Sequence, residues 1–180
     1  MFKLKSAIAG SLFAISAMAA TSAFAYTPGG YSTAGPGSTS LTFAGFPIPC
    51  TGQFGVYVPS SGSPTAYIVN NPPSYPTKFT GSAACNAITP NGLTTTTGWL
   101  IGVATPVPGM PGYYQAPVTG ASVSVGSLGI TCAQQSTDTI TLTINQNVTP
   151  HVASFAGTLH FGAIPCGVNG TGLNTNITAP

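Results

Sequence analysis

The sequence predicts an all-β protein, a single antiparallel β-sandwich or jelly-roll-like domain that is closed by two disulfides. The 180 residues include 23 glycines and 17 prolines, which disfavour long helices beyond the N-terminal segment. Short stretches of alternating apolar and polar residues recur along the chain, separated by clusters of Gly, Pro and Ser. The four cysteines all follow the N-terminal segment, and their number is even.

Residues 1–25 have the three parts of a secretory signal peptide, so we expect them to be removed before folding. Lys3 and Lys5 form the basic start, residues 7–20 are a run of apolar and small residues, and AFA at 23–25 is an A-x-A cleavage site. The run is shorter than the roughly 20 residues that span a bilayer, so a membrane anchor is the weaker interpretation. We therefore expect an exported protein with no integral membrane span after cleavage, either released or held at the cell surface.

Cleavage would leave one cation and one anion, Lys78 and Asp138, and lower the formal net charge from +2 to zero. A basic surface for nucleic acid or anionic membrane is therefore not expected. Solubility must depend on Ser, Thr, Asn, Gln and the backbone, and a net charge near zero favours association. This composition is typical of a matrix, interface or assembly protein and not of a cytosolic enzyme.

Cys50, Cys85, Cys132 and Cys166 predict two disulfides in an oxidising compartment. Four cysteines allow three connectivities, and the sequence does not decide among them. The similar separations of 35 and 34 residues favour Cys50–Cys85 and Cys132–Cys166. Each closed loop would stabilise the fold by about 3–4 kcal/mol. There is no C-x-x-C pair, so we expect no metal.

Similar phrases around the cysteines suggest a diverged internal duplication. LTFAGFPIPC (41–50) and VSVGSLGITC (123–132) both run from a short alternation into a cysteine. KFTGSAACNAI (78–88) likewise resembles LHFGAIPCGV (159–168). Chance similarity between Gly/Thr-rich β sequences is the alternative, and it stays open.

The clearest strand covers residues 138–145, where Ile140, Leu142 and Ile144 lie on one face and threonines on the other. Trp99 stands among aliphatic residues, so we expect it in the core. One domain over residues 40–180 is the economical interpretation, because half of it would be too small for its own core. Similar short segments occur at 40–44, 53–58, 65–69, 97–104, 121–125 and 152–161.

Two stretches lack the strand pattern. Residues 26–39 (YTPGGYSTAGPGST) predict a flexible Gly/Pro/Ser/Thr arm. Residues 105–117 (TPVPGMPGYYQAP) predict a long exposed loop. Tyr113 and Tyr114 in that loop form a candidate contact site, which would stack on sugars if the protein were a carbohydrate-binding module.

The supply of catalytic side chains is very small. Asp138, His151, His160 and Lys78 are the only groups of the usual acid–base kind after the signal. His151 and His160 are separated by an odd number of positions along one segment, so an extended strand would point them to opposite faces. There is no G-x-S-x-G, P-loop or dinucleotide motif. We therefore expect no enzymatic activity, no catalytic residue and no cofactor.

Self-association is another possibility, because TITLTIN (139–145) is β-prone and uncharged and few charges block pairing between strand edges. The protein would then be an extracellular structural subunit or adhesin of a biofilm matrix or fibre. The prolines argue against a continuous cross-β core.

The phrases TFAGFPIPC, KFTGSAAC and SFAGTLHFGAIPC, together with the export signal and the near absence of charge, resemble the bacterial protein activators of alkane oxidation. The resemblance implies a secreted protein of Gram-negative bacteria that aids growth on hydrocarbons by dispersing or contacting insoluble alkane. It supplies no catalytic residues. The leading hypothesis is therefore a secreted, non-enzymatic, surface-active protein whose partner is a hydrophobic surface or hydrocarbon.

Overall fold

The computed structural model describes residues 25–179, so all but the last residue of the expected signal peptide lies outside the described residues. These residues form an antiparallel all-β fold with two very short helices, which confirms the predicted class. The elements are β1 (Gly30–Phe43), β2 (Phe46–Val58), β3 (Ala66–Val69), β4 (Lys78–Gly81), α1 (Ala83–Asn86), β5 (Ile88–Pro90), β6 (Trp99–Ile101), β7 (Thr105–Pro106), β8 (Tyr113–Thr119), β9 (Ser122–Val125), η1 (Gly126–Leu128), β10 (Ile130–Ala133), β11 (Ile140–Asn145), β12 (His151–Phe161) and β13 (Ile164–Thr175).

The sheet closes on itself into a barrel and does not clearly form the expected sandwich. The strands follow the order β11-β8-β6-β3-β2-β1-β13-β12, and β12 pairs back with β11 from Ile140↔Gly157 to Asn145↔Val152. The four strands β1, β2, β12 and β13 are 11 to 14 residues long. Strands of this length twist far enough for the two ends of an eight-stranded sheet to meet.

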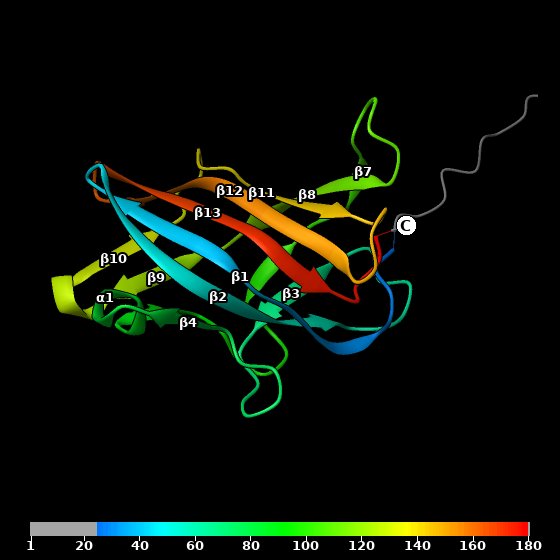
Figure 1. Cartoon of the computed structure of the whole chain (residues 1–180), viewed down its shortest axis with the longest axis horizontal. Helices are drawn as coiled ribbons and strands as arrows, with labels where there is room; N and C mark the ends of the chain where they lie inside the picture. The colour runs from blue at the N-terminus through cyan, green and yellow to red at the C-terminus, as the bar shows by residue number, and fades with distance from the viewer. Residues whose placement is uncertain (1–24, 180) are drawn as a thin grey trace, which may run out of the picture.

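The two long hairpins, β1–β2 and β12–β13, extend beyond the barrel (Figure 1). There β10 pairs with β12 through Ala133↔His160 and is followed by β9 and β5. On the other side, β4 pairs with β2 and leads into α1. The turn ends of the hairpins therefore pair with short strands at one end of the molecule. At the other end the same hairpins are part of the closed barrel.

The barrel interior is filled with apolar side chains. Ile140 and Ile144 of β11 are buried while Thr141 is exposed, which confirms the predicted period of two. Trp99 is 6% exposed, and its Nε1 donates a hydrogen bond to the Asn91 carbonyl oxygen at 2.9 Å, as expected for a core residue.

Residues 26–39 are not a flexible arm, and that prediction is wrong. Tyr26 is 1% exposed and donates a hydrogen bond from Oη to the Gly102 carbonyl oxygen at 2.8 Å. From Gly30 onward the chain is β1, paired with β2 and, from Ala34, with β13. The Gly-Pro-Gly at 35–37, a sequence that disfavours a regular strand, lies at a register shift typical of a β-bulge. A Cβ on Gly37 would lie 2.6 Å from the Thr171 carbonyl oxygen, so close strand approach requires glycine there.

The expected exposed loop at 105–117 is also shorter than predicted. Only residues 107–112 connect β7 to β8, and Tyr113 is already the first residue of β8, paired with Asn145. In β8 the buried Ala116 and Val118 alternate with exposed residues. Pro117 hid this alternation in the sequence because proline is rare inside paired strands.

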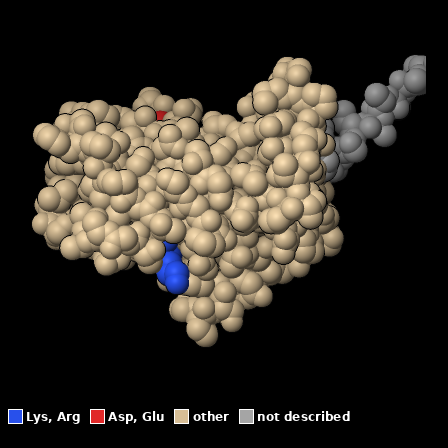
Figure 2. Space-filling model, in the orientation of Figure 1, with Lys and Arg blue, Asp and Glu red and all other residues tan. Residues whose placement is uncertain are grey.

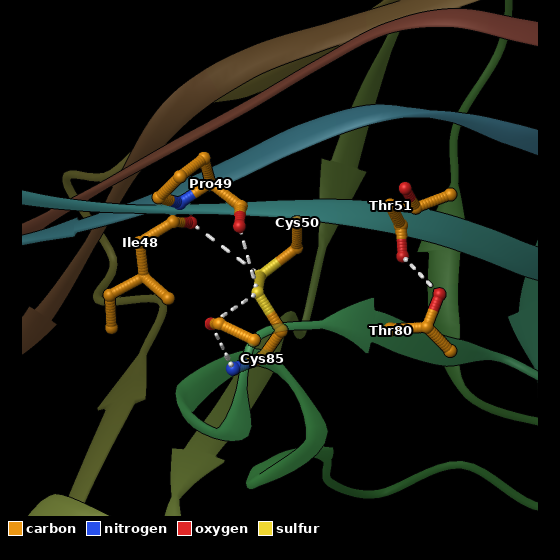
Figure 3. Close-up of a disulfide and its surroundings, with 7 residues drawn as sticks. Ile48, Pro49, Cys50, Thr51, Thr80 and Cys85 are labelled. Carbon is orange, nitrogen blue, oxygen red and sulfur yellow. Dashed lines mark hydrogen bonds between the residues drawn. A yellow bond between two sulfur atoms is a disulfide. The ribbon is translucent and has the colours of Figure 1, made fainter.

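The disulfides join Cys50 to Cys85 and Cys132 to Cys166, which is the pairing that the spacing favours. The first ties β2 to α1 (Figure 3). The N-cap residue of α1, Ser82, accepts a hydrogen bond on Oγ from the Cys85 N–H at 3.3 Å. The second ties β10 to β13, and both of its cysteines are fully buried. Within residues 25–179 there is no helix long and apolar enough to cross a membrane.

Removing either disulfide as a Cys→Ala pair should lower the free energy of unfolding by about 3–4 kcal/mol, since the two closed loops have nearly equal length. Urea unfolding followed by circular dichroism measures this. The Cys132→Ala/Cys166→Ala pair should lose more than Cys50→Ala/Cys85→Ala, because Cys50 is only half-buried. A loss below about 1 kcal/mol for both pairs would contradict the proposed role of the loops.

Burial raises the pKa of the Tyr26 phenol far above its usual value of 10.0. Because the pKa of Tyr26 is higher in the folded than in the unfolded state, the neutral phenol makes its full contribution to the free energy of unfolding below about pH 10. This contribution is lost as the pH rises further. Wild-type protein should therefore lose unfolding free energy between about pH 9 and 11.5 more steeply than Tyr26→Phe, which cannot ionise there. Urea titrations of both proteins at several pH values provide the comparison, and equal slopes would refute a buried phenol.

Candidate functional site

The two long hairpins end in turns of the same sequence type. LTFAGFP (41–47) and LHFGAIP (159–165) both place two small residues between a phenylalanine and an apolar residue followed by proline. In the first turn Ala44 has φ +48° and Gly45 has φ +84°, as a type I′ turn requires. In the second, Gly162 has φ +60° at the first central position. Such two-residue turns match the twist of the strands and keep the hairpins tight up to their tips.

The pairing of β1 with β13 brings the two turns side by side. Phe43 of β1 is the register partner of Cys166 of β13, three residues after the second turn. The rings of Phe43 and Phe161 meet edge to face with centroids 6.1 Å apart. Figure 1 shows both turns at the left end of the molecule, the end that also holds η1.

This end of the molecule exposes large apolar side chains. Phe46 is 76% exposed, Leu128 of η1 54%, Ile164 40% and Phe161 39%. A hollow of about 440 Å³ lies between the β1–β2 hairpin and the segment that includes η1. We call the following set the apolar tip: Phe43, Phe46, Ile48, Leu128, Phe161 and Ile164. A contiguous exposed apolar surface of this kind marks an interaction site.

The connection between β10 and β11, residues 134–139, forms hydrogen bonds to the β12–β13 hairpin. Gln135 donates a hydrogen bond from Nε2 to the Gly162 carbonyl oxygen in the turn at 2.9 Å. His160, next to the tip residue Phe161, has its Nδ1 2.9 Å from the Asp138 carboxylate, whose side chain is 4% exposed. The Gln135 N–H also donates to Asp138 Oδ2 at 2.8 Å. These contacts fix the position of the second turn relative to the rest of the sheet.

The hydrogen bond from the Gln135 backbone, followed by that from His160, holds the pKa of Asp138 below its usual value. The carboxylate therefore stays ionised, while the surface around it has almost no other charge. Figure 2 shows one basic and one acidic group on a face that is otherwise uncharged. Lys78, the one lysine or arginine in residues 25–179, lies in β4 and not in the tip.

The residues singled out from the sequence do not gather at one place. Tyr113 and Tyr114 begin β8, and Tyr114 packs against the core instead of standing in an exposed loop. His151 and His160 lie at opposite ends of β12, and His151 Nδ1 is 2.9 Å from the Val148 carbonyl oxygen. No group of three or more His, Cys, Asp or Glu side chains within residues 25–179 is arranged to hold a metal ion.

The sequence interpretation missed the apolar tip, although the signal was present. The sequence similarity between residues 41–50 and 123–132 does not correspond to a shared tight hairpin, because η1 separates β9 from β10; the hairpin that matches 41–50 in geometry is 159–166. Two small residues between phenylalanine and an apolar residue predict a tight hairpin with apolar flanks. The internal duplication stays a prediction.

Comparison with protein-family models, curated proteins and solved structures found no match, so the geometry of the chain itself must support any function.

Because the folded-state pKa of Asp138 is lowered, its contribution to stability is present above the unfolded value of about 3.8 and is lost as the pH falls below it. Asp138 is the only acidic side chain in the sequence, so Asp138→Asn should remove most of the acid dependence. Urea unfolding at about pH 7, 4 and 2.5 tests this. Wild type should be the more stable protein at pH 7 and approach the variant at pH 2.5. A constant difference at all three pH values would argue against an ionised, hydrogen-bonded carboxylate.

Proposed function

We propose that this chain is a secreted, non-enzymatic, surface-active protein that promotes contact with, or emulsification of, a hydrophobic substrate such as an alkane. The apolar tip is the observation that carries the proposal. Phe46 and Leu128 are each more than half exposed, and Phe161 and Ile164 stand beside them. In water these side chains are unfavourable, and an oil surface would cover them.

The exposed side chains of the apolar tip are large enough to give a substantial free energy of transfer from water into oil. Complete burial of a large apolar side chain contributes about 1.5–3 kcal/mol, and four partly exposed chains would together supply several kcal/mol on entering oil. The tight turns and the Gln135–Gly162 hydrogen bond hold these side chains in place, so little conformational entropy is lost on adsorption.

The distribution of charge supports the same role. A charged group near oil would be costly to desolvate, and the apolar tip contains no ionisable side chain. Asp138, in the connection between β10 and β11, is already paired with His160, the neighbour of the tip residue Phe161. The two disulfides are consistent with an oxidising compartment, and the resemblance to the alkane-oxidation activators points in the same direction.

The geometry favours the two alternative functions less. The window 139–145, considered for fibre assembly, is largely β11, and this strand is paired on both sides with β8 and β12. The strands left with one free edge along their length, β4, β5 and β7, have only two to four residues. For a carbohydrate-binding module, the packing of Tyr114 against the core removes part of the expected stacking surface.

Replacing the two most exposed tip residues, Phe46→Ser/Leu128→Ser, should weaken adsorption at a hexadecane–water boundary. The variant should need at least about tenfold more protein than wild type to lower the interfacial tension equally, since the lost transfer free energy exceeds about 1.4 kcal/mol. Pendant-drop tensiometry measures the effect.

The matched control is Met110→Ser/Val148→Ser, because these residues are 45% and 43% exposed and lie outside the tip. It should behave as wild type, and thermal unfolding should show that both variants are folded. The proposal fails if wild-type protein does not lower the tension at micromolar concentration, or if the control loses as much as the tip variant. Fibres in electron micrographs of the same samples would support the assembly alternative.

A further inference from the structure

We propose that the barrel interior is a second binding site, which takes one small hydrocarbon of about three carbon atoms, such as propane. The site is separate from the apolar tip and does not rest on the proposed interfacial role. At the tip, bulk oil would cover exposed side chains. In the interior, a single molecule would occupy an existing cavity.

A cavity of about 80 Å³ lies inside the sheet. All eight strands of the barrel contribute to its wall, among them β1 with Ala34, β8 with Val118 and β13 with Leu173. Native cores contain few voids larger than a water molecule, which takes about 30 Å³ of the liquid. Eight strands form a barrel just wide enough either to be filled by side chains or to hold one small ligand. Here the side chains leave part of the interior unfilled.

Small side chains leave this space open. Ala34, Ala66, Ala121 and Ala153 all line the cavity, and each is at most 8% exposed. Valine and isoleucine are more usual at buried strand positions, and each would fill part of the space. The cavity therefore follows from the choice of alanine on several strands that face one another across the interior.

The aromatic part of the wall is held in place by its own contacts. The rings of Phe54 and Phe155 meet edge to face with centroids 5.3 Å apart. Phe155 also packs over Gly170, where a Cβ would lie 2.2 Å from the ring. These contacts keep both rings in the wall, so that neither of them fills the cavity.

The cavity wall is almost entirely apolar, and this composition disfavours water and ions inside it. Tyr26, the one ionisable side chain that the structure shows in the wall, already donates its hydroxyl to the Gly102 carbonyl oxygen at 2.8 Å. Burial raises its pKa, so the phenol stays neutral. A buried water needs two to four polar partners, which such a wall does not supply. A carboxylate or ammonium would be buried without an opposite charge.

The volume and the polarity of the cavity together determine the class of ligand. An engineered apolar cavity of about 150 Å³ stays dry and binds benzene, which has six carbon atoms. By proportion, a cavity of about 80 Å³ accommodates about three carbon atoms. Ethanol has as many heavy atoms as propane, but it would bury a hydroxyl without a partner. The cavity therefore selects a small hydrocarbon over an alcohol of the same size.

The direct test is an NMR titration of the isotope-labelled exported protein with propane, with ethanol and sodium acetate as matched probes. We expect saturable shifts, and intermolecular NOEs from propane to the methyl groups of Ala153 and Val118 and to the Phe155 ring. Ethanol should bind at least tenfold more weakly, and acetate should give no NOEs at the same concentration. Propane NOEs confined to the apolar tip, no saturable binding, or equal affinities for propane and ethanol would overturn the proposal.

A substitution that fills the cavity separates binding in the interior from binding at the surface. Ala153→Val adds two carbon atoms to the wall, so its affinity for propane should fall at least fivefold. The matched control is Ala156→Val, which makes the same change at an exposed position of β12 outside the wall, and it should bind propane as wild type does. Wild-type affinity in Ala153→Val, or an equal loss in both variants, would refute the assignment. If Ala153→Val does not fold, the wild-type NOEs alone decide.

Discussion

The antiparallel pairing of β1 with β13 determines both ends of this molecule. It runs from Ala34↔Thr175 to Phe43↔Cys166 and joins the first long hairpin to the last one. At one end, this junction lets the β11–β12 pairing close the barrel. At the other, it lays the two hairpin turns next to each other. Since the partners are far apart in sequence, their pairing requires a large loss of chain entropy, which the two disulfides reduce by restricting the unfolded chain.

Closure of the barrel also explains the division between a buried apolar interior and an exposed apolar tip. The hairpins are longer than the barrel needs, so their last residues extend past the closed ring and carry Phe46 and Ile164 into solvent. In a protein with abundant surface charge such residues would stand among ionised groups. Here Lys78 and Asp138 are the only charged side chains beyond the expected signal, so the tip continues into a neutral polar surface. In the proposed function, the exposed apolar patch and the lack of charge would act together at a boundary with oil.

Local patterns predicted local structure, and they failed where distant strands meet. The alternation at 140–145 and the burial of Trp99 were predictable from the sequence. The cysteine spacing favoured the observed disulfide pairing without deciding it. The barrel was not predictable, because nothing in residues 140–145 indicates that this strand pairs with both β8 and β12. Strand β1 was partly hidden by the Gly-Pro-Gly at 35–37, whose glycines serve a bulge and a close approach to β13. The apolar tip was predictable in principle from the two hairpin phrases, but their side-by-side placement depends on β1–β13 pairing.

The orientation of the protein on an oil droplet tests the central claim most directly. In a Trp99→Phe background, a single tryptophan is introduced either at the tip by Phe46→Trp or at the far loop by Met110→Trp. Each protein is adsorbed to hexadecane droplets that contain a brominated alkane, which quenches indole fluorescence on contact. If the tip enters the oil, the indole at position 46 is quenched and its emission shifts to the blue, while the indole at position 110 is unchanged. Equal quenching at both positions, or quenching only at position 110, would contradict adsorption through the apolar tip.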